Sequence, residues 1–313
     1  MKKTLIAAGL ASLMTTTAMA EGIGVTMAAF DDNFLTVLRN GIQAQADAAG
    51  LSVQIEDAQN DVAKQLDQIN NFIASGVDAI IVNPVDTSAT QAMSDAAAAA
   101  GVPLVYVNRQ PINVDTLPDG QAFVASNESD SSRQGFIEQC NQWAAAGKTE
   151  VSAYVMQGEL SNQAAVQRTQ NYYDVMEAGQ CAVKVTIIDQ QTANWSRDQA
   201  QSLMTNWLST GTAFDGVLAN NDEMALGAIQ AIKAASISMD AVIVSGVDAT
   251  QDALASMQAG ELDITVFQNA AAQGGGALDA AVKLAAGEAV EKKVYIPFEL
   301  VTPANIDGYL AKN

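Results

Sequence analysis

The stretch VPLVYVNRQP, from Val102 to Pro111, joins a short apolar run to polar residues at its end. Leu104 to Val107 are apolar without interruption, which is typical of a strand buried on both faces in a parallel sheet. Asn108 and Arg109 follow at once, and a proline then prevents an orderly continuation of the strand. In open α/β sheets, ligands bind beyond the carboxyl ends of the strands. The stretch therefore predicts an α/β fold and the location of its site.

The same alternation of apolar runs and helical periods extends along the chain. It begins with IGVTM at Ile23, and the helix after it carries one apolar stripe that includes Leu35, Leu38 and Ile42. Strands that alternate with helices predict a parallel sheet covered on both faces. The alternation restarts at Ala122, after a segment rich in Pro, Asp and Asn. The residues alone thus indicate two doubly wound units in succession.

The first twenty residues have the pattern of a signal peptide. Two lysines precede the apolar run Leu5 to Met14, and the small residues Ala18–Ala20 form a cleavage site. The run is too short to span a bilayer, and an ordinary amphipathic N-terminus is the alternative. We expect cleavage after Ala20, which leaves 293 of the 313 residues as an exported protein. That length suits two lobes.

The mature chain is strongly acidic. Removal of Lys2 and Lys3 leaves 13 of the 15 basic residues against 35 acidic ones, a net charge of −22. Such a surface repels phosphate backbones, which argues against nucleic acid as a partner. The chain has no histidine, so it lacks the commonest general base and metal ligand, and we expect no cofactor.

The two cysteines, Cys140 and Cys181, are too few for a structural zinc site. In an oxidising compartment an even pair is expected to form a disulfide. Two buried free thiols are the alternative.

Nearly every expected strand ends in an amide, a carboxylate or a guanidinium. These groups hold fork-shaped donors and acceptors that suit the vicinal hydroxyls of a sugar or cyclitol. Aromatic residues among them could cover the apolar faces of a ring. The strand-end set comprises Asp31, Asp32, Phe34, Asn83, Asn108, Arg109, Gln157, Asn194, Trp195, Asn220, Asn221, Asp222, Asp248 and Gln268.

Each of these positions has a structural alternative. Asn and Asp after a strand are also good helix N-caps, and Asp222 and Asn60 suit that role well. Arg109 cannot be a cap, so its alternative is a surface salt bridge. Phe34 lies off the apolar stripe and need not face the core. Arg168, in the middle of a helix, has a weaker case from pattern alone.

Signals for catalysis are poor. No glycine-rich phosphate loop is complete, and the lack of histidine excludes Ser–His and Cys–His chemistry. A glycosidase that uses Asp32 and Asp248 is the remaining enzyme hypothesis. The residues favour a binding protein that is not an enzyme.

Three motifs together resemble a known family. LANNDEMALGAIQAI (218–232), VSGVDATQDAL (244–254) and VNRQ (107–110) are similar to the ribose-binding-protein-like, type I periplasmic binding proteins of ABC importers. The resemblance runs from about Ile23 to Val301. It implies two Rossmann-like lobes with parallel sheets, joined by a hinge of three crossovers, and a sugar in the cleft between them.

The resemblance also implies how the chain divides. Crossovers are expected near Ser126, Gln268 and Glu299. The N-terminal lobe would then comprise 21–126 with 269–299, and the C-terminal lobe 127–268 with 300–313.

By position, the family's ligand contacts fall on eight residues, and Asn108 replaces an aspartate of the ribose-type pattern. Other departures, such as Leu35 in place of a phenylalanine, argue against ribose itself. The segment 103–130 resembles the inositol- and rhizopine-binding branch. The expected ligand is a neutral polyol ring, a cyclitol such as myo-inositol or a monosaccharide. The expected ligand contacts are Asp32, Phe34, Asn108, Arg109, Arg168, Trp195, Asn221, Asp248 and Gln268.

In this set the charges of Asp32 and Asp248 balance those of Arg109 and Arg168, which favours a neutral ligand over a phosphorylated one. An aminated cyclitol is the closest competitor, because either carboxylate could pair with its ammonium group.

The resemblance implies a periplasmic monomer that delivers its ligand to the membrane permease of an ABC importer. A sensor that presents the ligand to a chemoreceptor is an alternative. Sugar-responsive repressors share the core but carry a DNA-binding headpiece, whereas this chain has a signal-peptide pattern and a large negative charge.

Overall fold

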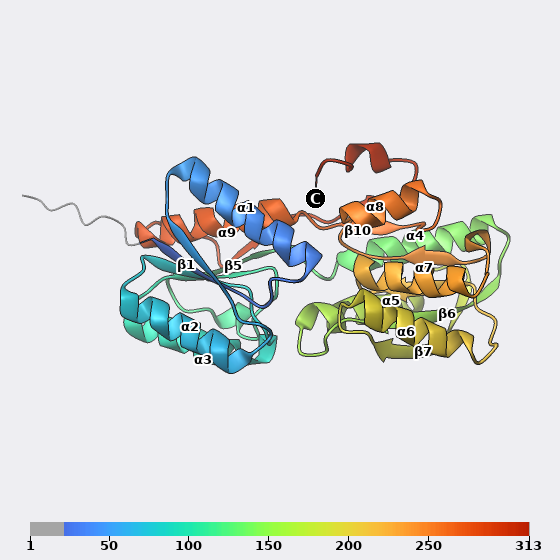
Figure 1. Ribbon diagram of the computed structural model, residues 1–313, viewed down its shortest axis with the longest axis horizontal. Coiled ribbons are helices and arrows are strands. Elements are labelled where there is room, and N and C mark those ends of the chain that lie inside the picture. The colour runs from blue at the N-terminus through green and yellow to red at the C-terminus, as the bar shows by residue number, and fades with distance from the viewer. Residues whose placement is uncertain (1–21, 313) are drawn as a thin grey trace, which may run out of the picture.

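The computed structural model describes residues 22–312, which form two lobes along the long axis of the molecule (Figure 1). The expected signal peptide, residues 1–20, lies outside the described residues. Within 22–312, none of the helices has the length and hydropathy needed to cross a bilayer. The predicted α/β class with parallel sheets in two lobes is confirmed.

The first lobe is built on a six-stranded parallel sheet in the order β11-β5-β4-β3-β1-β2. Its strands are β1 (Ile23–Met27), β2 (Val53–Asp57), β3 (Ala79–Val82), β4 (Leu104–Val107), β5 (Gln121–Ala125) and β11 (Lys293–Tyr295). Each face carries two helices, which is why the central strands are uninterrupted apolar runs (Figure 1). The helices are α1 (Asn33–Ala49) with α9 (Ala270–Ala285), and α2 (Val62–Ser75) with α3 (Thr90–Ala100).

The second lobe has a four-stranded parallel sheet in the order β7-β6-β8-β9. Its strands are β6 (Glu150–Gln157), β7 (Lys184–Thr192), β8 (Gly216–Ala219) and β9 (Ile243–Ser245). Two core clusters lie against it. One involves α6 (Arg197–Leu208), α7 (Asp222–Ala234) and α8 (Gln251–Gln258), and the other α4 (Ser131–Ala145) and α5 (Gln163–Glu177). A separate antiparallel pair, β10 (Thr265–Phe267) and β12 (Glu299–Val301), departs from the all-parallel expectation.

The chain passes between the lobes three times, after β5, after β10 and after β11. The residue-based expectation of two units in succession is therefore incomplete. Helix α9 and strand β11 come last in the chain yet belong to the first lobe. Local periodicity identifies a helix or strand but does not say which sheet it joins. We propose lobe boundaries at these three passages, 21–126 with 269–299 and 127–268 with 300–313.

Helices α1 and α9 touch through their backbones at two glycines. A Cβ built on Gly274 would lie 2.3 Å from the carbonyl oxygen of Leu38, and one on Gly41 would lie 2.6 Å from that of Ala271. Any side chain at these positions would push the helices apart, so the packing of this layer requires glycine.

We predict that Gly274→Ala destabilises the protein by about 1–3 kcal/mol, because the added methyl group meets backbone that cannot move aside. Gly275→Ala is the matched control. Its Cβ would lie 3.8 Å from Gln45, and alanine favours the helix by about 0.5–1 kcal/mol. Urea unfolding measures both variants. Equal stabilities for the two would contradict this account of the helix contact.

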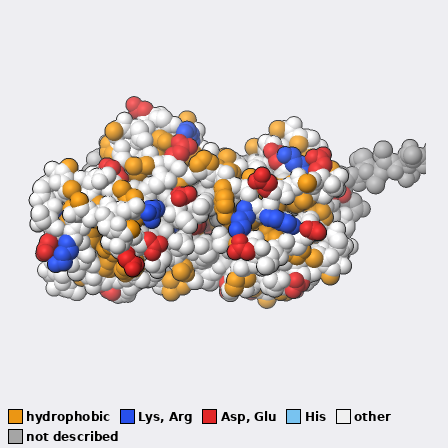
Figure 2. Space-filling model, turned by 180° about the vertical axis from the view of Figure 1, so that it is seen from behind, with side chains coloured by type: hydrophobic (Ala, Val, Ile, Leu, Met, Phe, Trp, Pro, Cys, Tyr) orange, Lys and Arg blue, Asp and Glu red, His pale blue; other side chains and the backbone are white. Residues whose placement is uncertain are grey.

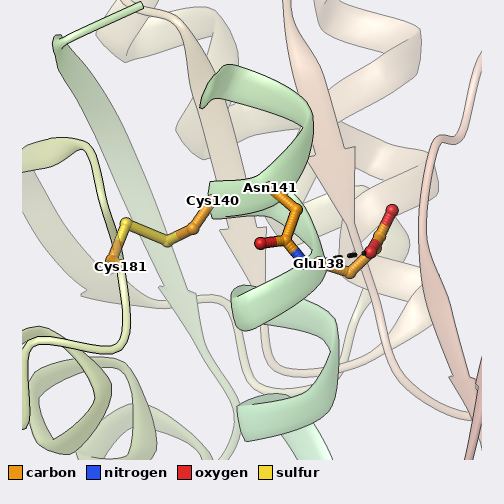
Figure 3. Close-up of a disulfide and its surroundings, with 4 residues drawn as sticks. All are labelled: Glu138, Cys140, Asn141 and Cys181. Carbon is orange, nitrogen blue, oxygen red and sulfur yellow. Dashed lines mark hydrogen bonds between the residues drawn. A yellow bond between two sulfur atoms is a disulfide. The ribbon is translucent and has the colours of Figure 1, made fainter. Parts of the chain in front are cut away.

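Cys140 and Cys181 are joined in a disulfide with a Cα–Cα distance of 5.3 Å. Figure 3 shows the bond running from α4 to the neighbouring loop, on the side of the helix away from Glu138. Phe136 and Trp143 share the surrounding core cluster. The bond closes a loop across 41 residues, which reduces the conformational freedom of the unfolded chain.

We predict no titratable thiol in the unfolded, unreduced exported protein. The double variant Cys140→Ser/Cys181→Ser should lose up to about 4 kcal/mol of stability by the loop-closure argument. Its ligand affinity should stay unchanged, because neither cysteine lines the cleft described below. Two reactive thiols in the unreduced protein would refute the bond.

Candidate functional site

A cavity between the lobes brings together all nine predicted site residues. It encloses a volume of about 40 Å³. Most of the lining comes from loops and helix starts of both lobes at the carboxyl ends of the strands, and Arg168 comes from within α5. Its members are Asp32, Phe34, Asn108, Arg109, Arg168, Trp195, Asn221, Asp248 and Gln268, together with the unpredicted Leu35, Asn162 and Ala164.

Arg109 follows β4 and is only 5% exposed, so it is not a surface salt bridge. Its Nη1 donates to the carbonyl oxygens of Pro84 at 3.1 Å and Val85 at 3.3 Å. The same nitrogen lies 3.6 Å from Glu159 of the second lobe. These are its polar contacts among the described residues, so Nε and Nη2 remain available to a ligand.

Asn108 belongs to a chain of amide hydrogen bonds beneath the cavity. Its Oδ1 accepts from Asn83 and its Nδ2 donates to Gln273, both at 3.3 Å. Gln273 in turn donates to Ser126 Oγ at 2.9 Å. Asn108 has φ of +66°, a conformation that asparagine tolerates better than most residues. The amide plane is therefore held in one orientation before a ligand arrives.

Arg168 differs from Arg109 because protein groups engage all three of its nitrogens. Nε and Nη2 form a fork with Glu128 at 2.8 and 2.9 Å. Nη1 donates to the Asn220 carbonyl at 2.9 Å, and Nη2 to Gln268 Oε1 at 3.0 Å. Burial opposes the charge, yet Glu128 and then Asp248 hold the pKa of Arg168 above its ordinary value.

Three carboxyl groups at the cleft are harder to ionise than usual. Burial raises the pKa of Asp32 and of Glu159, and in each case Arg109 opposes the shift. Burial also raises the pKa of Asp248 well above its ordinary value, against the attraction of Arg168 at 3.8 Å. Carboxyl groups in a cleft whose pKa is shifted by burial are a frequent mark of a functional site.

Capping and cavity lining coincide at two residues. Asp32 caps α1 by accepting from the Leu35 N–H at 2.7 Å, and Asn221 caps α7 by accepting from Met224 at 3.0 Å. Each of these two residues is therefore both a helix N-cap and part of the cavity lining.

The expected caps at Asp222 and Asn60 are wrong by one residue, since Asn221 and Asp61 fill those positions. A helix start read from pattern alone is uncertain by that much. Asp222 instead accepts from Thr250 N at 2.9 Å and Thr265 Oγ1 at 2.7 Å, and burial raises its pKa to about 6.

The two predicted aromatics approach the cavity from different lobes. Phe34 lines the cavity, as expected, and also packs in the core of the first lobe. The Trp195 ring lies so close to Gly158 that a Cβ there would be 2.2 Å from it. Its indole N–H is buried without a hydrogen-bond partner among residues 22–312. That donor is free for a ligand oxygen.

Two acidic residues were missed in the sequence. Glu128 follows β5 and Glu159 follows β6, so the strand-end pattern applied further along each loop would have found both. With them, four carboxylates and two guanidiniums lie at or against the cavity. The lining itself holds the expected two carboxylates and two guanidiniums, whose formal charges cancel, and Glu128 and Glu159 behind it bring the formal excess to two negative charges. No group of acidic or cysteine side chains in the described part of the chain is arranged to hold a metal ion.

On the rear face in Figure 2, basic side chains occur singly or in small groups, often beside acidic ones. The described residues of that face form no continuous basic surface of the kind that binds a phosphate backbone.

Comparison with known proteins places the chain in a family. Residues 23–289 match the family described as a periplasmic binding protein domain. A Rhizobium meliloti protein to which rhizopine binding is provisionally assigned is 59% identical over the full length of both chains. The ribose import binding protein of Bacillus subtilis is 30% identical over 90% of this chain and 87% of its own.

Two solved structures are also similar. A Bacillus halodurans ABC transporter solute-binding protein with bound myo-inositol has a TM-score of 0.88 and 39% identity, over 96% of this chain and all of that one. The Caulobacter myo-inositol-binding protein has a TM-score of 0.84 and 28% identity, over 93% and 96% of the two chains. The fold, the two-lobed cleft and these matches together show that the chain belongs to the periplasmic binding protein family.

Proposed function

We propose that this protein is the solute-binding component of an ABC importer and that it binds a polyol ring, a cyclitol ahead of a monosaccharide, between its lobes. The observation that carries the proposal is the set of amide, carboxylate and guanidinium groups at strand ends of both sheets around one cavity. Myo-inositol in the two solved relatives supports a cyclitol.

The cavity offers the contacts that such a ring needs. Arg109 has two nitrogens free to donate to neighbouring hydroxyls, and Asn221 and Asp32 present oxygens on helix starts. Phe34 and Trp195 can cover the apolar faces of the ring from opposite lobes. A hydroxyl that accepts from the Trp195 indole would satisfy its buried N–H.

A buried ligand must enter from water, so the lobes must separate and close. Several hydrogen bonds join the two lobes through residues that do not line the cavity. Thr87 of the first lobe accepts from the Gln163 N–H at 3.2 Å and donates to the Ser161 carbonyl at 2.9 Å. At the start of α1, Asn33 donates to Glu223 in the first turn of α7 at 2.8 Å. We propose that ligand contacts and these bonds together favour the closed form.

An aminated cyclitol is the second candidate ligand. The observation that favours it is the excess of carboxylates, since Asp32, Asp248 or Glu159 could pair with an ammonium group. A cation on the ligand would also offset part of the cost of burying these groups.

For both candidate ligands we propose that the protein binds the ligand without changing it chemically. Asp32 already caps a helix and Asp248 lies beside Arg168, which leaves a glycosidase without a free carboxylate pair.

We further propose that the mature protein acts in the periplasm and that its partner is the permease of the importer. A chemoreceptor remains the alternative partner. Binding of the loaded protein to purified permease or to a receptor's sensory domain separates the two.

Calorimetry on the mature protein tests the ligand class. We predict binding of myo-inositol and of an amino-deoxy-inositol, with weaker binding of ribose and much weaker binding of an inositol monophosphate. Each ligand should be recovered unchanged. Tight binding of the phosphate, or a chemically altered product, would contradict the proposal.

We predict that Arg109→Ala lowers affinity for myo-inositol by about 2–5 kcal/mol, because it removes donors to the ligand and leaves Glu159 without its partner. Arg109→Lys keeps the charge but not the fork and should recover only part of the loss. Near-normal affinity in Arg109→Ala would remove this residue from the site.

A further inference from the structure

Glu128 does not line the cavity, yet it binds Arg168, which does. We propose that Glu128 determines which ligand charge the cleft accepts: it neutralises Arg168 and so makes the cleft select against anions and in favour of neutral or cationic rings. This inference rests on the proposed function of the cleft as a polyol site.

Glu128 and Arg168 form a buried, fork-shaped ion pair. Both oxygens of Glu128 meet Arg168 in a fork at 2.8 and 2.9 Å, and the side chains are 4% and 5% exposed. Water cannot screen a pair buried to this degree. At such distances and in low dielectric the two charges act on their surroundings nearly as one neutral unit.

Protein groups hold Glu128 in place independently of the ligand. Its carbonyl oxygen accepts from Asn171 Nδ2 at 2.8 Å and from Ser131 Oγ at 2.7 Å. These bonds tie the passage between the lobes to α4 and α5. The main chain at Glu128 is therefore positioned before a ligand binds, and the fork with Arg168 orients its carboxylate.

Other charged groups remain at the cavity besides the Glu128–Arg168 pair. With Arg168 neutralised, Arg109 is the cation left at the cavity among the described residues, against Asp32, Asp248 and Glu159. An anionic ligand would then meet more negative charge than positive. Without Glu128, the full charge of Arg168 would act on the cavity and weaken that preference, because the formal excess would fall from two negative charges to one.

A purely structural role for Glu128 predicts something different. If the residue only supported the chain between β5 and α4, its loss would lower affinity for every ligand by the same factor. A role in charge selection instead changes the ratio between ligands of different charge. That ratio is the readout, because a partly misfolded sample cannot alter it.

The test compares Glu128→Gln with the unmodified mature protein by calorimetry. The probes are myo-inositol, an inositol monophosphate and an amino-deoxy-inositol. Each is compared with itself in the two proteins, so ligand size cancels. We expect affinity for the phosphate, relative to myo-inositol, to rise about tenfold or more, and that for the amine to fall by a similar factor. Equal changes for all three ligands would overturn the inference.

Two further variants make the result specific. Glu150→Gln removes a carboxylate from an exposed pair with Lys184, where both side chains are about 70% exposed, and should leave the ratios unchanged. Glu128→Gln/Arg168→Gln replaces one neutral unit by another and should keep the ligand ratios of the unmodified protein. If the double variant instead gains phosphate binding, or if Glu150→Gln shifts the ratios equally, the inference fails.

The double variant also keeps the test decisive if Glu128→Gln alone does not fold, since it removes both members of the buried Glu128–Arg168 pair. Failure of the proposed function would give a different experimental result from failure of this inference. In that case the unmodified protein binds none of the three probes.

Discussion

Parallel strand pairing is the constraint on which the rest of this structure depends. It places the carboxyl ends of all strands of a sheet at one edge, so every loop that leaves those ends reaches the same region. Two sheets whose edges face each other then concentrate polar loops around one cavity. The site needs no special scaffold beyond the fold, and its residues can come from almost any part of the chain.

This concentration of loops has a cost in backbone strain. Of the eight non-glycine residues with positive φ in 22–312, five lie on cleft loops: Asn108, Asn194, Trp195, Asp248 and Ala249. Such conformations cost of the order of 1–3 kcal/mol each unless the surroundings impose them. Trp195 and Asp248 are unlikely choices for loops that served only as connections. Their presence there is best explained by what their side chains reach.

The sequence was sufficient for the class of fold and for the strand-end residues, because both follow from local patterns. It was not sufficient for pairing across the chain. The fork between Glu128 and Arg168 joins residues 40 positions apart, and nothing in the spacing indicates it. For the same reason the sequence did not show that Arg168 is held by a carboxylate whereas Arg109 keeps donors free. The return of α9 and β11 to the first lobe was predicted from the family resemblance and not from the periodicity of the sequence.

The order of the elements along the chain has a consequence for how the protein folds. The central sheet and helices of the second lobe come from one continuous segment, so they can assemble before β12 and the residues after it pack against them. The first lobe waits for α9, which covers a face of its sheet beside α1, and for the edge strand β11. Until those last elements arrive, the earliest part of the chain exposes apolar surface. The central sheet of the N-terminal lobe is thus expected to be completed after that of the C-terminal lobe, and factors that protect nascent chains should act mainly on it.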